Sequence, residues 1–241
     1  MGAIYKCCYP HRVYGFWKIF WKFGQIPAIQ HIIKEILFML ENVEKVQERL
    51  KSKLTAKRYI HTTGVRYTAA ALAMRYGLSV EDASMAGVLH DCAKCFSDDE
   101  LVRKCLKNNL ECTETELRNG FLLHAKLGAY YAKKKYGVEN EEIISAIRYH
   151  TTGKAGMTPL EAVVFTADYI EPGRKPLPHL EEVRRMAFVD IDEAVYQILD
   201  RTLGYLGDKA KTDNSGREID VHTVEAFKYY RQIHMEKDIK F

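Results

Sequence analysis

The chain has 241 residues, of which 47% are hydrophobic and 28% are charged, and this composition is typical of a folded protein with a substantial core. The net charge of +4 lies within residues 1–38, and residues 39–241 are neutral overall. Charge therefore gives no support to nucleic-acid binding by the main part of the chain. Six cysteines in so long a chain do not form a secreted disulfide scaffold, so we expect a cytoplasmic protein.

Residues 1–38 read as a basic, aromatic extension that contains both tryptophans, Trp17 and Trp21. They hold no run of about 18 uncharged apolar residues, which argues against a transmembrane span. The extension is predicted to be either poorly ordered or upstream sequence translated before a true start at Met39. An interfacial membrane anchor is the less favoured alternative. The folded domain is predicted over residues 39–241.

Helical patterns begin directly after the extension. Four apolar residues recur there at helical spacing: Val43, Val46, Leu50 and Leu54. A second helix is predicted over about 55–76, with Gly77 placed to end it. Ser79 with Asp82 then marks the start of a helix that ends at His90.

Capping signals divide the next part of the domain. Thr113 and Glu116 predict a capping box before a helix that carries His124 and ends near Gly137. The following helix is predicted to begin at Asn140 and to end near His150. Each of these predicted helices therefore carries a histidine, His124 within the first and His150 at the end of the second.

Three further helices complete the predicted domain. Residues 158–161 (TPLE) combine an N-cap, a proline at the first helical position and a glutamate, and they predict the helix that carries Asp168. Another helix is predicted from Asp190 to about Leu206, followed by a loop over 208–218. The last runs from Val221 to about His234. Strand-like alternation is absent from the sequence, so the predicted fold is all-α.

Six side chains are polar where helical periodicity predicts apolar residues: His61, His90, Asp91, His124, His150 and Asp168. Any one of these histidines could be a core residue bonded to a backbone carbonyl. Asp168 is harder to explain in this way, because a buried carboxylate without a partner costs several kcal/mol, and no Lys or Arg lies within one helical turn. Imidazole and carboxylate ligands together suit zinc, iron, manganese or cobalt.

Two metal ions explain this number of ligands better than one ion does. Asp91 could bridge them through its two oxygens. The predicted ligands divide between the ions as His61, His90 and Asp168 on one side, and His124 and His150 on the other. A hydroxide between two such ions is a strong nucleophile at neutral pH, and the pair suits in-line displacement at phosphorus. The sequence thus predicts hydrolysis of a phosphate ester or anhydride.

Neighbouring residues provide candidate phosphate contacts. Lys94 follows Asp91 by three residues and is assigned a catalytic role beside it. Arg174 lies in the loop after Asp168 and could bind phosphate through two donors. Thr151, Thr152 and Lys154 follow His150 and are further candidates, although each cation could equally be a solvated surface residue.

The order of the six candidate ligands resembles that of the HD superfamily of metal-dependent phosphohydrolases. Four stretches further resemble its YqeK family of symmetrical bis(5'-nucleosyl)-tetraphosphatases: residues 58–65 (RYIHTTGV), 86–94 (AGVLHDCAK), 150–153 (HTTG) and 167–174 (ADYIEPGR). The resemblance implies an HD-type helical bundle with two irons between its helices. It also implies cleavage of diadenosine tetraphosphate into two ADP, metal roles for the six residues and a phosphate role for Arg174. Ala125 and residues 1–38 depart from the family pattern.

Other functions remain open at this point. Another HD-type activity on nucleotides, such as a nucleotidase or a guanosine tetraphosphate hydrolase, would use the same ligands. A nucleotide-binding module without turnover is an alternative from a different class. The sequence leaves a homodimer as an open hypothesis and gives no partner beyond the nucleotide substrate.

Overall fold

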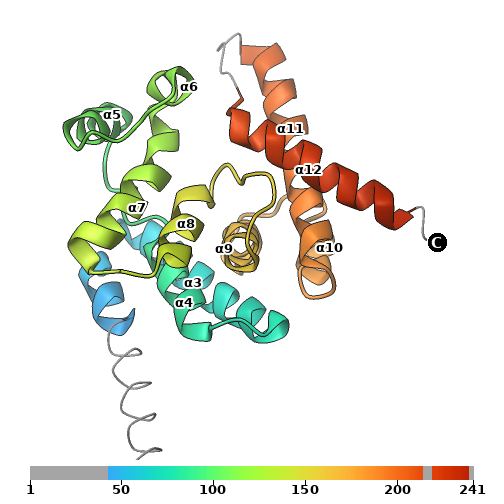
Figure 1. The fold of residues 1–241 in the computed structure, drawn as a ribbon, viewed down its shortest axis with the longest axis horizontal. Helices are drawn as coiled ribbons and strands as arrows, with labels where there is room; N and C mark the ends of the chain where they lie inside the picture. The colour runs from blue at the N-terminus through green and yellow to red at the C-terminus, as the bar shows by residue number, and fades with distance from the viewer. Residues whose placement is uncertain (1–42, 214–218, 239–241) are drawn as a thin grey trace, which may run out of the picture. The chain divides into compact units, whose positions relative to one another are not determined.

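The computed structural model describes residues 43–213 and 219–238, and every regular element among them is helical (Figure 1). Residues 43–51 form the first described helix. The other elements are, in chain order, α3 (Ala56–Tyr76), α4 (Val80–Leu89), α5 (Asp98–Lys107), α6 (Glu114–Arg118), the 3-10 helix η1 (Gly120–Leu122), α7 (Leu123–Tyr136), α8 (Glu141–Tyr149), α9 (Pro159–Ile170), α10 (Leu180–Met186), α11 (Ile191–Asp213) and α12 (Val221–Asp238). The all-α prediction is confirmed.

The described residues belong to one compact unit that begins at Val43. The predicted extension, residues 1–38, lies outside the described part of the chain. No helix in that described part is long and apolar enough to cross a membrane.

Local capping fixes most helix boundaries where the sequence predicts them. The Thr55 hydroxyl caps the start of α3, and Gly77, at φ +68°, ends it in the left-handed conformation that glycine tolerates. Ser79 caps α4 in the same way as Thr55 caps α3. Thr158 and Glu161 form the predicted capping box of α9.

The region between α4 and α7 differs from the prediction. Helix α5 was not predicted, although Ser97 and Glu100 form a complete capping box at its start. The single helix expected after Thr113 is instead broken into α6 and α7. The break lies at Gly120, which packs so closely on α5 that a Cβ there would lie 2.8 Å from the carbonyl oxygen of Asp98. A contact between distant segments, invisible to local periodicity, therefore decides the break.

Two further differences lie near the C-terminus. Helix α10 was not predicted, and α11 continues to Asp213 rather than ending near Leu206. The predicted loop at 208–218 therefore begins as helix, and residues 214–218 lie outside the described residues. The apolar pattern ends near Leu206, and residues 207–213 (GDKAKTD) continue α11 although only Lys209, Ala210 and Lys211 among them have high helix propensity.

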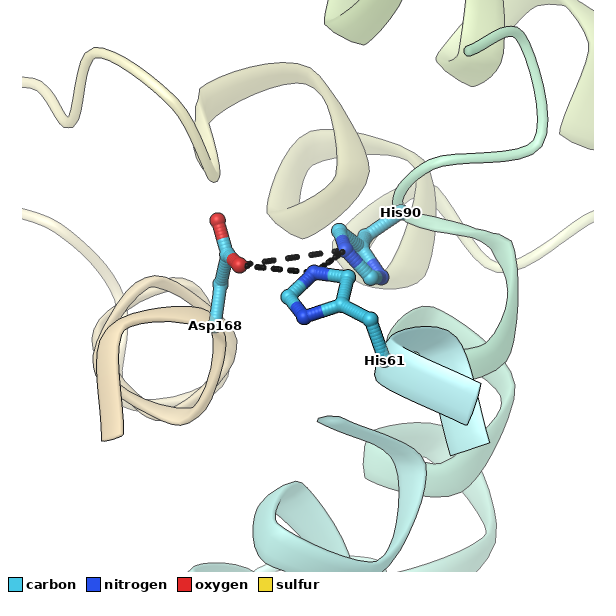
Figure 2. A group of neighbouring side chains, drawn as sticks. All are labelled: His61, His90 and Asp168. Carbon is cyan, nitrogen blue, oxygen red and sulfur yellow. Dashed lines mark hydrogen bonds and ion pairs between the residues drawn. The ribbon is translucent and has the colours of Figure 1, made fainter. Parts of the chain in front are cut away.

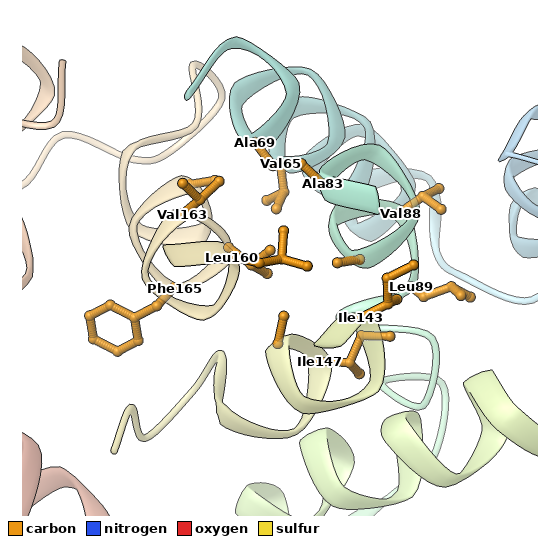
Figure 3. Packing of buried hydrophobic residues seen from close by; sticks show 14 of the residues in the cluster. Val65, Ala69, Ala83, Val88, Leu89, Ile143, Ile147, Leu160, Val163 and Phe165 are labelled. Atoms are coloured by element: carbon orange, nitrogen blue, oxygen red, sulfur yellow. The ribbon is translucent and has the colours of Figure 1, made fainter. Parts of the chain in front are cut away.

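Helices α3, α4, α8 and α9 enclose the part of the core that lies beside the candidate ligands. Their buried apolar residues converge as Figure 3 shows: Val65 and Ala69 from α3, Val88 and Leu89 from α4, Ile143 and Ile147 from α8, and Leu160 and Val163 from α9. Gly87 lets α4 approach α3 closely, because a Cβ at this position would lie 2.9 Å from the Cα of Arg66. Helix α9 also packs against α11, which connects this core to the C-terminal helices.

Candidate metal centre

The four candidate histidines lie near helix ends that meet in space. His61 lies in the second turn of α3, and His124 is the second residue of α7. His90 and His150 are the C-terminal cap residues of α4 and α8. The Nε2 atoms lie 3.3 Å apart for His61 and His90, and 3.2 Å apart for His124 and His150. The structure therefore brings the predicted histidines together as two pairs.

Backbone carbonyls fix the orientation of three of these imidazoles. His90, His124 and His150 each contact, through Nδ1, the carbonyl oxygen of the residue three positions earlier. The distance is 2.7 Å for His90 and for His150. A ring that donates from Nδ1 carries its free lone pair on Nε2. The carbonyl contacts expected of ordinary core histidines are thus present, but they leave every Nε2 available as a metal ligand.

For His61, the partner of Nδ1 is the Glu171 carboxylate rather than a backbone carbonyl. Its Oε1 lies 3.0 Å from His61 Nδ1, and its Oε2 accepts from the Gly173 N–H at 2.5 Å. The carboxylate is buried, and a Cβ on Gly64 would lie 2.5 Å from Oε2. Glu171 was not predicted to have a role, although it lies in the 167–174 motif. The signal that could have revealed it is a glutamate directly after the strongly apolar α9.

We expect Glu171→Gln to weaken metal binding and turnover by about 10- to 100-fold, the usual effect of losing a partner behind a ligating histidine. His61 and Gly173 contact different oxygens of the carboxylate, and a glutamine would replace one of these acceptors with an NH₂ donor. Metal titration of the purified variant, alongside its kcat, measures the effect. Glu181→Gln, at an exposed position on α10, is the control. Metal affinity equal to that of the wild type would show that Glu171 does not position His61.

Asp91 divides its two oxygens between the histidine pairs. Oδ2 lies 3.7 Å from Nε2 of His61 and 3.4 Å from Nε2 of His90. Oδ1 lies 3.3 Å from Nε2 of His124 and 3.6 Å from Nε2 of His150. Asp91 could therefore offer one oxygen to an ion at each histidine pair.

Asp168 completes the first group of donors, as Figure 2 shows. Its Oδ1 lies 3.1 Å from His61 Nε2 and 4.0 Å from His90 Nε2. This oxygen is buried and makes no hydrogen bond of acceptable geometry with the described residues. Arg174, in the loop after α9, places its Nη2 3.8 Å from this oxygen. A cation therefore does approach Asp168, although none lies within one helical turn of it. An unsatisfied buried carboxylate oxygen beside two imidazole nitrogens fits a divalent metal ion.

For Asp91 and His124 the electrostatics favour the protonation states that bind metal. Burial opposes ionisation of Asp91, yet the neighbouring His90, His124 and His150 hold its pKa well below the usual range. Burial lowers the pKa of His124 to about 4. At neutral pH Asp91 is therefore charged and His124 is neutral, as ligation requires.

Arg58 was not predicted as a functional residue, and it contacts the centre directly. Its Nη1 donates to Asp91 Oδ2 at 2.6 Å. It precedes His61 by three residues, so both side chains lie on one face of α3. That spacing is the signal from which it could have been found.

The predicted phosphate contacts after His150 occupy different environments. Thr151 Oγ1 lies 3.1 Å from His124 Nε2 and 3.0 Å from His150 Nε2, beside the second histidine pair. Thr152 donates to the Gly153 carbonyl oxygen instead. The phosphate role predicted for Thr152 therefore has no support in this geometry.

Lys154 and Lys94 also differ from one another. Lys154 forms an ion pair of 2.8 Å with the buried Glu161, so its predicted phosphate role has no geometric support either. Lys94 is half-buried, and burial lowers its pKa, against the attraction of Asp91. Its backbone N–H donates to the Asp91 carbonyl oxygen at 2.9 Å, but no hydrogen bond or ion pair joins its ammonium group to another residue of the described chain. An ammonium group that no described residue pairs, beside the centre, can contact an anionic ligand.

A cleft of about 1050 Å³ opens beside the first group of donors. Its wall includes His61 and Arg58 from the start of α3, Glu171 and Arg174 from the loop after α9, and residues of α11. Such a volume is at the upper end of the range for small-molecule sites. A ligand in the cleft would therefore reach the edge of the centre.

Comparison with known proteins agrees with this architecture. Residues 58–173 match the HD domain family. The chain is 40% identical over 165 residues to "Bis(5'-nucleosyl)-tetraphosphatase, symmetrical" of Bacillus subtilis (strain 168), covering 68% of this chain and 88% of that protein. It is 37% identical over 199 residues to the protein of the same name from Staphylococcus aureus, covering 78% and 94%.

A solved structure supports the fold as well. It is a predicted HD superfamily hydrolase involved in NAD metabolism from Clostridium acetobutylicum, with a TM-score of 0.73 and 35% identity. The match covers 78% of this chain and 96% of that one. HD domains bind divalent metal ions, and two groups of donors here could each hold one: His61, His90 and Asp168, and His90, Asp91 and His150. The chain belongs to the HD-domain family of symmetrical bis(5'-nucleosyl)-tetraphosphatases.

Proposed function

We propose that this protein hydrolyses diadenosine tetraphosphate, and related dinucleoside polyphosphates, symmetrically into two nucleoside diphosphates. The observation that carries the proposal is the division of Asp91 between two histidine pairs. The family membership supports this substrate class, because the relatives named above are symmetrical tetraphosphatases.

Six residues would hold the two metals: His61, His90, Asp91, His124, His150 and Asp168. When bound, two such ions supply a nucleophile from water at neutral pH and stabilise in-line displacement at phosphorus. The chain's own contribution is to hold the donors rigidly through the backbone carbonyls and Glu171. Iron is the metal we propose, with manganese, zinc or cobalt as substitutes that the same ligands accept.

Three further residues are proposed to act on the phosphates. Arg174 binds a non-bridging oxygen next to Asp168, where its guanidinium already lies. Lys94 neutralises charge that develops during the displacement. Thr151 offers its hydroxyl group at the edge of the second histidine pair.

Product analysis of the purified protein with diadenosine tetraphosphate tests the proposal. ADP as the sole product, from protein with about two metals per chain, is expected. Inorganic phosphate or pyrophosphate as a product would instead favour a nucleotidase or a guanosine tetraphosphate hydrolase. Nucleotide binding without turnover by metal-loaded protein would favour a binding module.

The domain that begins at residue 39 is proposed to be sufficient for this activity in the cytoplasm. We expect a chain that starts at Met39 to keep the kcat and KM of the full chain, because every donor lies beyond residue 58. Parallel assays of the two chains measure this. Loss of folding on removal of residues 1–38 would contradict the proposed boundary, and size measurement of both chains would show whether a homodimer forms.

A further inference from the structure

The cleft beside the metal centre extends beyond the residues that match the HD domain. One part of its wall comes from α11, which contributes Arg201, Thr202 and Tyr205. The HD match ends at residue 173, so this wall is an addition of the C-terminal helices. Helix α11 packs against α9, and this contact holds the two parts of the wall together.

The charges on the wall suit a polyphosphate. Five cationic residues line the cleft: Lys57, Arg58, Arg174, Lys175 and Arg201. Among its described lining residues Glu171 alone is acidic, and both of its oxygens are engaged, by His61 and by Gly173. The cleft therefore presents an excess of positive charge to any ligand.

Arg201 is held in place by contacts on α11 and α10. Its Nη1 donates to the carbonyl oxygen of Gln197 at 3.0 Å, and its Nη2 lies 3.7 Å from Glu182. Burial raises the pKa of Tyr169, and the guanidinium groups of Arg201 and Arg174 both oppose this shift. The two arginines thus approach the same tyrosine of the cleft wall, Arg174 at the metal end and Arg201 from α11.

Exposed aromatic and apolar surface accompanies these charges. Tyr205 is 64% exposed, one helical turn beyond Arg201 on α11, and it lines the cleft with Ile60 and Leu177. A tyrosine ring is a platform on which any nucleobase can stack. Charge for phosphates and an aromatic surface for a base therefore occur on one helix.

We propose that α11 binds one nucleoside diphosphate arm of the substrate, with Arg201 on the phosphate next to the sugar and Tyr205 against the base. The choice of ligand rests on the proposed function. When this arm is bound, the phosphoanhydride bond that follows its second phosphate lies at the metal centre. The position of cleavage is then set by a helix outside the matched HD region.

Binding of ADP to the metal-loaded full chain, measured by calorimetry, tests this inference. Arg201→Ala and Tyr205→Ala should each weaken ADP binding by about tenfold or more, since stacking and charged contacts are typically of that size. Tyr205→Phe, which keeps the ring, should bind ADP as the wild type does. GDP should show the same losses, because stacking tolerates any base. Inorganic phosphate, which needs only the metal end, should bind all variants equally.

Two matched controls lie outside the cleft wall. Tyr67 on α3 is 61% exposed, and Arg185 on α10 is exposed. Tyr67→Ala and Arg185→Ala should leave ADP binding unchanged. Wild-type ADP affinity in Arg201→Ala or Tyr205→Ala would overturn the inference, as would an equal loss of inorganic phosphate binding. Suppose that the wild type binds ADP and the two variants show these losses, but the wild type cleaves no diadenosine tetraphosphate. The nucleotide site then stands and the proposed function fails.

Discussion

Replacement of Asp91 by alanine is expected to remove both metals and to abolish turnover. Each of its oxygens serves one histidine pair, so its loss takes a ligand from both ions at once. Loss of an outer partner of a metal ligand costs about 10- to 100-fold, and the loss of a shared ligand should exceed the upper value. Metal content per chain and kcat on diadenosine tetraphosphate measure the effect.

Asp91→Asn separates metal binding from packing, because it keeps the shape of the side chain while removing its charge. We expect this variant to fold and to lose metal. Asp99→Ala, at an exposed position in α5, is the matched control and should keep both metals. Turnover near that of the wild type in Asp91→Ala would disprove the two-metal arrangement.

Arg174→Ala is expected to keep both metals and to lower kcat/KM by about 10- to 100-fold, since a charge-assisted hydrogen bond typically contributes about 1.5–3 kcal/mol. The guanidinium lies on the cleft wall, 3.8 Å from Asp168, from where it could donate to a phosphate bound beside the metal centre. Steady-state kinetics with parallel metal analysis distinguishes binding of substrate from binding of metal.

Arg174→Lys should recover only part of this loss, because lysine keeps the charge but cannot donate through two parallel hydrogen bonds. Arg103→Ala, at an exposed position on α5, is the control and should behave as the wild type. If Arg174→Ala lost its metal instead, Arg174 would support Asp168 rather than contact the substrate.

Helix boundaries were the most predictable part of this protein. Caps such as Thr55, Ser79 and Thr158 act over three residues, so the sequence alone contains the signal. The break at Gly120 and the length of α11 were mispredicted, because the first depends on contact with α5 and the second continues beyond the apolar pattern. A local signal was present for α5 as well, in the capping box of Ser97 and Glu100, but the prediction did not use it.

The candidate ligands show the same division. The sequence by itself indicated all six, because each is a polar residue on an otherwise apolar helical pattern. It could not show how Asp91 shares its oxygens, nor that Glu171 and Arg58 contact the centre. Those facts depend on how helix ends separated by many residues approach one another. The packing of α3, α4, α7, α8 and α9 decides that approach, and the packing of α11 on α9 adds the far wall of the cleft.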